Sequence, residues 1–140
     1  MSGLSPKLPL ARTDEDGLWG LNKTFLETTK QNFKNLLLTS PGERVMDTFF
    51  GVGLRNYLFS QEGEFIKGNI EAKIHEQTKM YLPHIIILQV QVVDSSQSSQ
   101  VVPNSFFIKI TYRIAPLNKN DILEITIDAD KIEFMSPELL

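Results

Sequence analysis

The sequence predicts an α+β fold, with two main helices packed on one face of a three-stranded antiparallel meander sheet and an extended N-terminal arm. Two segments in the first part of the chain repeat apolar residues every three or four positions, which is typical of helices. Three later segments alternate apolar and polar residues, which is typical of strands. The links between those strands are polar and too short for a crossover helix, so neighbouring strands should run antiparallel.

The chain has 140 residues, close to the usual length of one domain, roughly 150. Residues 1–20 contain prolines and an acidic turn at 14–17 but no sustained periodicity, so we expect an arm and a turn. A single domain should follow over residues 21–135, with a short C-terminal tail at 136–140.

The first helix should run from Thr24 to about Leu38 and bury one face. Thr24 and Glu27 have the spacing of a capping box, in which each side chain satisfies backbone donors at the start of a helix. The segment Ser40-Pro41-Gly42 supplies the stop signal. The apolar positions of the predicted face are Leu26, Phe33, Leu36 and Leu37.

We interpret the segment 41–61 as a packed connector, because its apolar residues come in groups that a folded chain must largely bury. We expect a short helical turn over Leu54–Phe59. A second helix should cover residues 62–82 and end before Pro83, which disfavours helical backbone in the preceding residue. Its buried stripe follows four-residue steps through Ile66, Ile70, Ile74 and either Thr78 or Tyr81.

After Pro83 the apolar period changes to two. In the first strand, Leu88, Val90 and Val92 should share one face, opposite Gln89 and Gln91. The other two strands cover residues 106–114 and 123–128. One face of the sheet should meet water while the other receives both helices.

Composition excludes several classes of function. There are 14 basic and 17 acidic residues, a net charge of −3, which disfavours nucleic-acid binding by phosphate neutralisation. There is no cysteine, which excludes disulfides and thiolate metal sites. The longest aliphatic run, Ile85–Leu88, is far too short to span a bilayer, so no membrane span is expected.

Catalytic signatures are absent from the sequence. His75 and His84 lack partners at the short spacing typical of metal ligands, and Gly51-Val52-Gly53 lacks the third glycine of a dinucleotide loop. Pairs of carboxylates occur, but 17 acidic residues offer such pairs without specificity. We therefore expect no enzyme activity, no cofactor and no metal.

A more specific pattern covers residues 35–46, Phe50-Gly51-Val52-Gly53-Leu54 and Leu58-Phe59. This pattern resembles the baseplate wedge or sheath-initiator family of contractile phage tails, which includes type VI secretion baseplate homologues. The resemblance spans about residues 10–130. It implies a structural protein of the virion tail baseplate, assembled in the host cytoplasm. The implied partners are the wedge core-bundle proteins, the tail sheath protein and central hub or tube-initiator proteins.

Within this resemblance, the segment around the predicted helix stop looks like a scaffold that fixes the first helix against the connector. From the residues alone, this is a terminating turn in which Gly42 relieves a left-handed backbone and Glu43 pairs with Arg44. Arg44 additionally faces a partner in one interpretation. The residues of this structural motif are Pro41, Gly42, Glu43, Phe50, Gly51, Gly53 and Leu54.

The family's contact motif is a Glu-Pro-Arg triplet at the end of the second helix, implied to engage the wedge core bundle. The matching residues here are Leu82, Pro83 and His84, so only the proline is retained. Neutral histidine cannot reproduce the bidentate fork of arginine. We therefore predict a more apolar docking point at Tyr81, Leu82 and Pro83, with His84 at its rim.

A second interface is predicted at the sheet. An edge strand leaves backbone groups that another chain can pair with, and the family resemblance favours strand addition by the sheath. The alternative is an edge protected by the charges of Glu124 and Asp128. The predicted sheath-facing residues, on this strand or its neighbour, are Leu123, Glu124, Ile125, Thr126, Ile127 and Asp128.

Two other functions stay open. Members of this family have been labelled lysozymes, and such an enzyme would need a raised-pKa acid and a second carboxylate in a cleft. A similar fold also occurs in a bacterial anti-adaptor, a regulatory binding module. The segments Pro41–Arg44 and Phe50–Leu54 favour the baseplate interpretation over that module.

Overall fold

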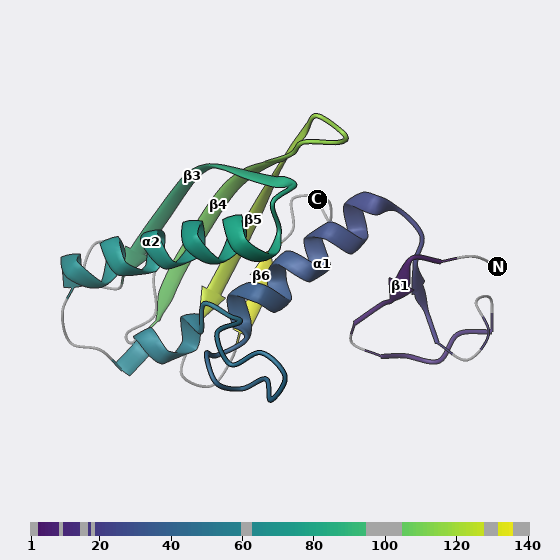
Figure 1. Ribbon diagram of the computed structural model, residues 1–140, viewed down its shortest axis with the longest axis horizontal. Helices are drawn as coiled ribbons and strands as arrows, with labels where there is room; N and C mark the ends of the chain where they lie inside the picture. Colours follow the sequence, from purple (N-terminus) through teal and green to yellow (C-terminus); the bar gives the residue numbers. More distant parts are fainter. Residues whose placement is uncertain are drawn as a thin grey trace.

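The computed structural model of the chain describes residues 3–8, 10–14, 17, 19–59, 63–94, 105–127 and 132–135. Two helices lie on one face of an antiparallel sheet, which confirms the predicted α+β class (Figure 1). The sheet has the strand order β3-β4-β5-β6, so the meander continues one strand beyond the prediction. The elements are α1 (Phe25–Leu38), α2 (Gly63–Tyr81), β3 (Ile85–Asp94), β4 (Phe106–Ile114), β5 (Lys119–Ile127) and β6 (Ile132–Met135).

Helix α1 begins with the predicted capping box. The backbone N–H of Glu27 donates to Thr24 Oγ1 at 3.2 Å, and the Glu27 carboxylate accepts from the N–H of Thr24 at 3.4 Å. The helix ends at Leu38, where Thr39 forms the C-cap. Phe33, Leu36 and Leu37 are buried as predicted.

The connector contains a short 3₁₀ helix, η1 (Leu54–Phe59), which confirms the predicted helical turn. Helix α2 follows and buries Ile66, Ile70, Ile74 and Thr78, so the predicted stripe ends on Thr78. Pro83 lies two residues beyond the end of α2, as expected of a residue that disfavours continuation of the helix.

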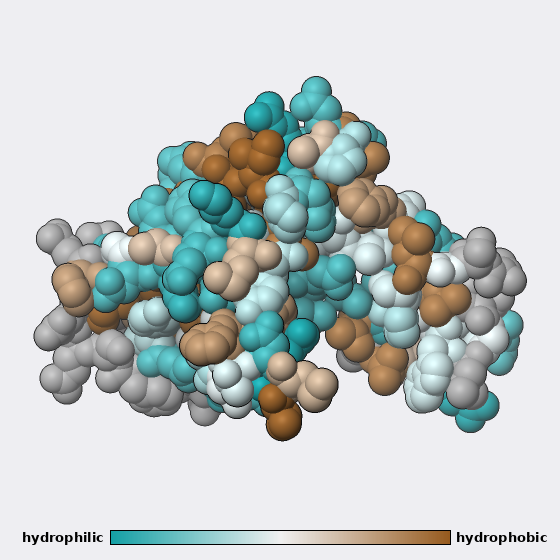
Figure 2. Space-filling model, in the orientation of Figure 1, coloured by the Kyte–Doolittle hydropathy of each residue, from teal (hydrophilic) through white to brown (hydrophobic). Residues whose placement is uncertain are grey.

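Strand β3 departs from the predicted alternation at Leu88. The pairing of β3 with β4 shifts register between Ile87 and Gln89, so Leu88 is an extra, bulged residue. Ile87 and Val90 pack against the core on either side of the shift, while Leu88 is 48% exposed. The prediction that Leu88 shares a face with Val90 and Val92 is therefore wrong. Figure 2 shows hydrophobic surface over β3 at the upper part of the view.

The core lies between the helices and the inner face of the sheet. Its sheet side consists of alternate residues of β4 and β5, which gives the burial pattern expected for a half-buried sheet. The ring of Phe33 from α1 packs edge-on against Tyr112 of β4, with ring centroids 5.0 Å apart. The buried residues of β4 and β5 are Ile108, Ile110, Tyr112, Ile114, Leu123, Ile125 and Ile127.

A polar cluster crosses this core and ties α1 to the sheet. The hydroxyl of Tyr112 donates to Asp121 Oδ2 at 2.9 Å, and the ammonium of Lys30 lies 3.4 Å from the same oxygen. The side chains of Lys30 and Asp121 are only 9% and 12% exposed. Burial of the lysine is tolerated because its charge is paired there.

The N-terminal arm folds back on itself and lies to the side of α1 (Figure 1). Its strand β1 (Ser5–Pro6) pairs antiparallel with β2 (Leu21–Asn22), just before α1. The side-chain amide of Gln31 on α1 donates to the carbonyl of Pro6 and accepts from the N–H of Leu8, both at 3.0 Å. The arm is therefore attached to α1 by hydrogen bonds. Among the described residues, neither helix has both the length and the apolar composition that a membrane span requires.

Candidate functional site

The connector between α1 and η1 packs directly on the end of α1, and Gly51 permits that approach. Gly51 has a φ of 113°, and a Cβ added there would lie 2.0 Å from the carbonyl oxygen of Thr39. The next residue, Val52, donates its N–H to the carbonyl of Leu36 at 3.0 Å. Only glycine fits this position, which explains one part of the predicted structural motif.

Helix α2 holds the connector from the other side through Gln77. Its side-chain oxygen accepts from the N–H of Gly51 at 3.0 Å, and its side-chain nitrogen donates to the carbonyl of Phe49 at 3.0 Å. Gln77 is 1% exposed, and the oxygen and the nitrogen of its side-chain amide each have a hydrogen-bond partner within the protein. Gln77 was not predicted from the sequence, although a polar side chain beside the buried stripe of α2 was a signal for it.

Tyr81, the last residue of α2, also contacts the connector. Its hydroxyl donates to Asp47 Oδ2 at 2.8 Å, and its ring packs edge-on against Phe50 with centroids 4.8 Å apart. The hydrogen bond to Asp47 is the largest cause that raises the pKa of Tyr81 above 10.0, followed by desolvation and the charge of Asp47, while Arg44 opposes the shift. Asp47 was not predicted as a site residue from the sequence.

The predicted pairing of Glu43 with Arg44 is wrong. The carboxylate of Glu43 instead accepts from the N–H of Ser40 at 2.9 Å, closing the turn in which Gly42 has the expected positive φ of 88°. The guanidinium of Arg44 lies 3.7 Å from the centre of the Phe50 ring, a cation–π contact. The Phe50 ring is thus contacted on its face by the guanidinium of Arg44 and also by the ring of Tyr81.

These contacts form a hollow of about 200 Å³ between α1, the connector and the end of α2. Three predicted wedge-contact residues, Arg44, Tyr81 and Leu82, line it together with Phe50 of the structural motif. Helix α1 completes it with two asparagines and one leucine that were not predicted as contact residues. The lining residues are Asn32, Asn35, Leu36, Arg44, Phe50, Tyr81 and Leu82.

The other two predicted contact residues lie outside the hollow. Pro83 is exposed beside it in the chain. The ring of His84 packs instead against Phe25 at the start of α1, with centroids 5.8 Å apart, and its carbonyl accepts from the N–H of Ala115. His84 is therefore directed toward the N-terminal end of α1 and does not line the hollow, and its place at the rim of a docking point stays a prediction.

The predicted sheath-facing strand is not an open edge over most of its length. Residues Glu124–Ile127 pair with β4 on one side and with β6 on the other, so their backbone groups are already used. Leu123, Ile125 and Ile127 are fully buried, and Glu124 forms an ion pair of 3.4 Å with Lys109. Thr126 is half-buried, and Asp128 lies outside the described residues. The terminal strands of the sheet are β3 and β6.

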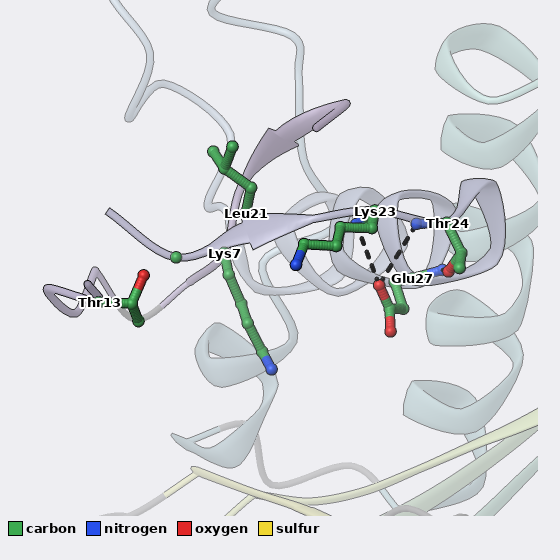
Figure 3. Close-up of a pocket in the computed structure, with 7 residues that line it drawn as sticks. Lys7, Thr13, Leu21, Lys23, Thr24 and Glu27 are labelled. Carbon is green, nitrogen blue, oxygen red and sulfur yellow. Dashed lines mark hydrogen bonds between the residues drawn. The ribbon is translucent and has the colours of Figure 1, made fainter. Parts of the chain in front are cut away.

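A second hollow, of about 440 Å³, lies between the arm and the start of α1 (Figure 3). Its polar lining includes Lys7, Lys23 and Glu27, but Glu27 is occupied by the backbone N–H groups of Lys23 and Thr24. The start of α1 is thus capped by its own side chains, which leaves its N–H groups less available to an external anion. In the described part of the chain, no three potential ligand side chains gather as a metal site requires.

Comparison with known proteins identifies the family. Residues 24–119, from the capping box to the start of β5, match the family described as baseplate wedge protein gp25. The chain belongs to this family. It is therefore a member of a family of structural tail-baseplate components, in agreement with the resemblance carried by residues 35–59. No curated protein sequence matches the chain.

Solved structures share the fold of this gp25-family chain. A candidate tail lysozyme from Geobacter sulfurreducens superposes with a TM-score of 0.64 and 24% identity, covering 80% of this chain and 97% of that one. A chain of the anti-feeding prophage baseplate superposes with a TM-score of 0.62 and 24% identity, covering 77% of this chain and 82% of that one. At this identity the likeness shows the fold alone.

Proposed function

We propose that the chain is a structural wedge subunit that joins the wedge core bundle of a contractile tail baseplate to the tail sheath. It acts without catalysis and without a cofactor, in the tail baseplate of the virion, after assembly in the host cytoplasm. The observation that carries this proposal is the convergence of Arg44, Tyr81 and Leu82 on one hollow, in a chain of the gp25 family. Hub or tube-initiator proteins are further neighbours in this arrangement.

The hollow supplies the contact with the wedge core. Phe50 and Leu82, both partly exposed, give it apolar surface, while Asn32, Asn35 and Arg44 supply hydrogen-bond groups. A small apolar centre with polar groups around it is the usual anatomy of a protein interface. Exposed Pro83 extends the apolar surface beside it.

The first test uses a substitution that fills the hollow without changing the core. Asn32 is exposed, so Asn32→Trp should leave the fold intact while its indole occupies the hollow. Binding to the purified wedge core-bundle proteins should weaken about tenfold or more. Asn120→Trp, at an exposed position of β5, is the matched control and should bind normally.

A second variant removes lining side chains. Tyr81→Ala combined with Leu82→Ala should lower co-purification of the wedge proteins, with thermal unfolding measured in parallel because Leu82 also packs against the core. Unchanged wedge binding by both this variant and Asn32→Trp, each in a folded protein, would reject the proposed contact.

The sheath contact is made by strand addition at an open edge of the sheet, and the length and the uncharged sequence of β3 favour that edge. Strand β6 has four residues, whereas β3 has ten and carries no charge from Ile85 to Val93. Charged side chains and short length are the usual protection of an edge against added strands. Among the described residues, no strand pairs with the outer edge of β3.

Two variants separate the edges. Leu88→Lys places a charge at the exposed bulge of β3, and truncation after Ile127 removes β6 while keeping the buried residues of β5. If β3 receives the sheath strand, Leu88→Lys should block sheath nucleation on assembled baseplates and the truncated chain should still support it. The reverse result would assign the contact to β6, and normal nucleation by both would reject strand addition.

Lysozyme activity is the rival function, since one structural relative is named as a candidate tail lysozyme. A glycosidase places two carboxylates across one cleft. The hollow has no carboxylate among its lining residues, and the second hollow has only Glu27, which caps α1. Both observations support the structural role. A peptidoglycan clearance assay on the purified protein should give no clearing.

A further inference from the structure

The outer side of the connector carries an apolar surface that nothing within the described chain covers. We define the connector loop as residues 43–50. Within it, Val45, Met46 and Phe49 are 92%, 98% and 78% exposed. The loop projects from the lower edge of the molecule in Figure 1, and Figure 2 shows hydrophobic surface at its tip. Single exposed apolar residues are common on proteins, but three on one short loop indicate a contact surface.

The backbone that carries these side chains is held from both sides. At its base, the N–H of Gly42 donates to the carbonyl of Thr48 at 2.8 Å. On the inner side, Tyr81 binds Asp47 and Gln77 binds the carbonyl of Phe49. The loop is therefore ordered before any partner arrives, which lowers the entropy lost on binding.

The charged group of the loop that can still bind a partner is a cation. Both oxygens of Asp47 accept hydrogen bonds, from Tyr81 and from the N–H of Phe49, and Glu43 accepts from Ser40. Arg44 lies over Phe50, is exposed, and forms no ion pair with any described carboxylate. Its guanidinium can therefore still donate to a carboxylate on a partner.

From these observations we infer that the connector loop inserts Val45, Met46 and Phe49 into an apolar groove on the wedge core-bundle proteins, with a carboxylate at the groove's rim paired to Arg44. A projecting loop with a fixed backbone fits a concave surface. This inference rests on the proposed wedge contact and extends it, because Arg44 and Phe50 belong both to the loop and to the hollow.

The experiment measures the affinity of the full chain for the purified wedge core-bundle proteins. Met46→Ser and Phe49→Ser should each weaken binding about tenfold, as expected for apolar side chains buried at the centre of an interface. Phe65→Ser is the matched control, because Phe65 is 70% exposed on α2, and its affinity should stay within about twofold. None of these changes touches the core, so thermal unfolding should be unaltered.

The charge is tested separately. Arg44→Gln should weaken binding and reduce its dependence on salt, because an interface charge pair is screened by ions. Equal salt dependence in the original chain and in Arg44→Gln would contradict the acidic rim.

The outcomes separate this inference from the proposed function. Normal affinity of Met46→Ser and Phe49→Ser, with loss in Asn32→Trp, would overturn the inference and keep the contact at the hollow. Normal affinity in all three would overturn both. If Phe49→Ser changes only the oligomeric state of the purified chain, the loop binds a second copy and the inference is wrong.

Discussion

The hydroxyl of Tyr81 donates a 2.8 Å hydrogen bond to Oδ2 of Asp47, joining residues 34 positions apart in the chain. This contact fixes the end of α2 to the middle of the connector loop. It brings Tyr81 beside Phe50, and Phe50 beside Arg44, so the hollow exists only while the loop is in place. The bond also requires a protonated phenol, since only the neutral hydroxyl can donate.

Stability should therefore fall at high pH through Tyr81. The pKa of Tyr81 is raised above its ordinary value of 10.0, mainly by the hydrogen bond to Asp47. A raised folded-state pKa means that the stabilisation is fully present below pH 10.0 and is lost as pH rises through the folded pKa. The measurement is the free energy of unfolding of the original chain and of Tyr81→Phe between about pH 8 and 11.5. The difference between the two should shrink as the pH rises above 10.0, whereas a constant difference would contradict the assignment.

Removing the side chain of Gln77 should be strongly destabilising. Gln77→Ala leaves the N–H of Gly51 and the carbonyl of Phe49 without their partner in a buried region, which costs about 2–4 kcal/mol in unfolding free energy. Gln91→Ala, at an exposed position of β3, should change it by less than about 0.5 kcal/mol. Chemical denaturation of both variants gives the comparison, and similar values would show that the connector is not held by Gln77.

Two glycine-to-alanine changes should have opposite signs. Gly51→Ala places a Cβ against the backbone of Thr39 and should cost about 3 kcal/mol or more, or prevent folding. Gly68→Ala lies in the exposed interior of α2 with nothing within 4 Å, so it should stabilise the protein by about 0.5–1 kcal/mol. Denaturant midpoints measure both, and a tolerated Gly51→Ala would refute the close approach to α1.

Asp121→Ala should destabilise the fold by about 3 kcal/mol, because it leaves the buried ammonium of Lys30 and the hydroxyl of Tyr112 without this carboxylate. Glu124→Ala, three residues along the same strand, removes a more exposed ion pair with Lys109 and should cost about 0.5 kcal/mol. Urea unfolding of both variants at neutral pH measures the two effects. Equal effects would mean that the Asp121 cluster contributes no more than a surface contact.

Much of the secondary structure could be predicted because its signals are local. The capping box of Thr24 and Glu27, the turn at Leu54–Phe59 and the helix end before Pro83 each depend on residues within four positions. Arg44, Tyr81 and Leu82 were named from the sequence as contact residues, but their meeting at one hollow was not predicted, and their contact with a partner stays a prediction. Asn32 and Asn35 of α1 were missed, because their presence at the hollow follows from how α1 packs.

The sequence by itself determined the fold class, the helix faces and the family, since periodicity, caps and motif spacing are properties of short segments. Only the tertiary structure decided the bulge at Leu88, the pairing of β5 with β6 and the position of His84 against Phe25. Each of these depends on backbone or ring contacts between separate elements. Such contacts are selected by packing across the whole core, and periodicity along one segment does not encode them.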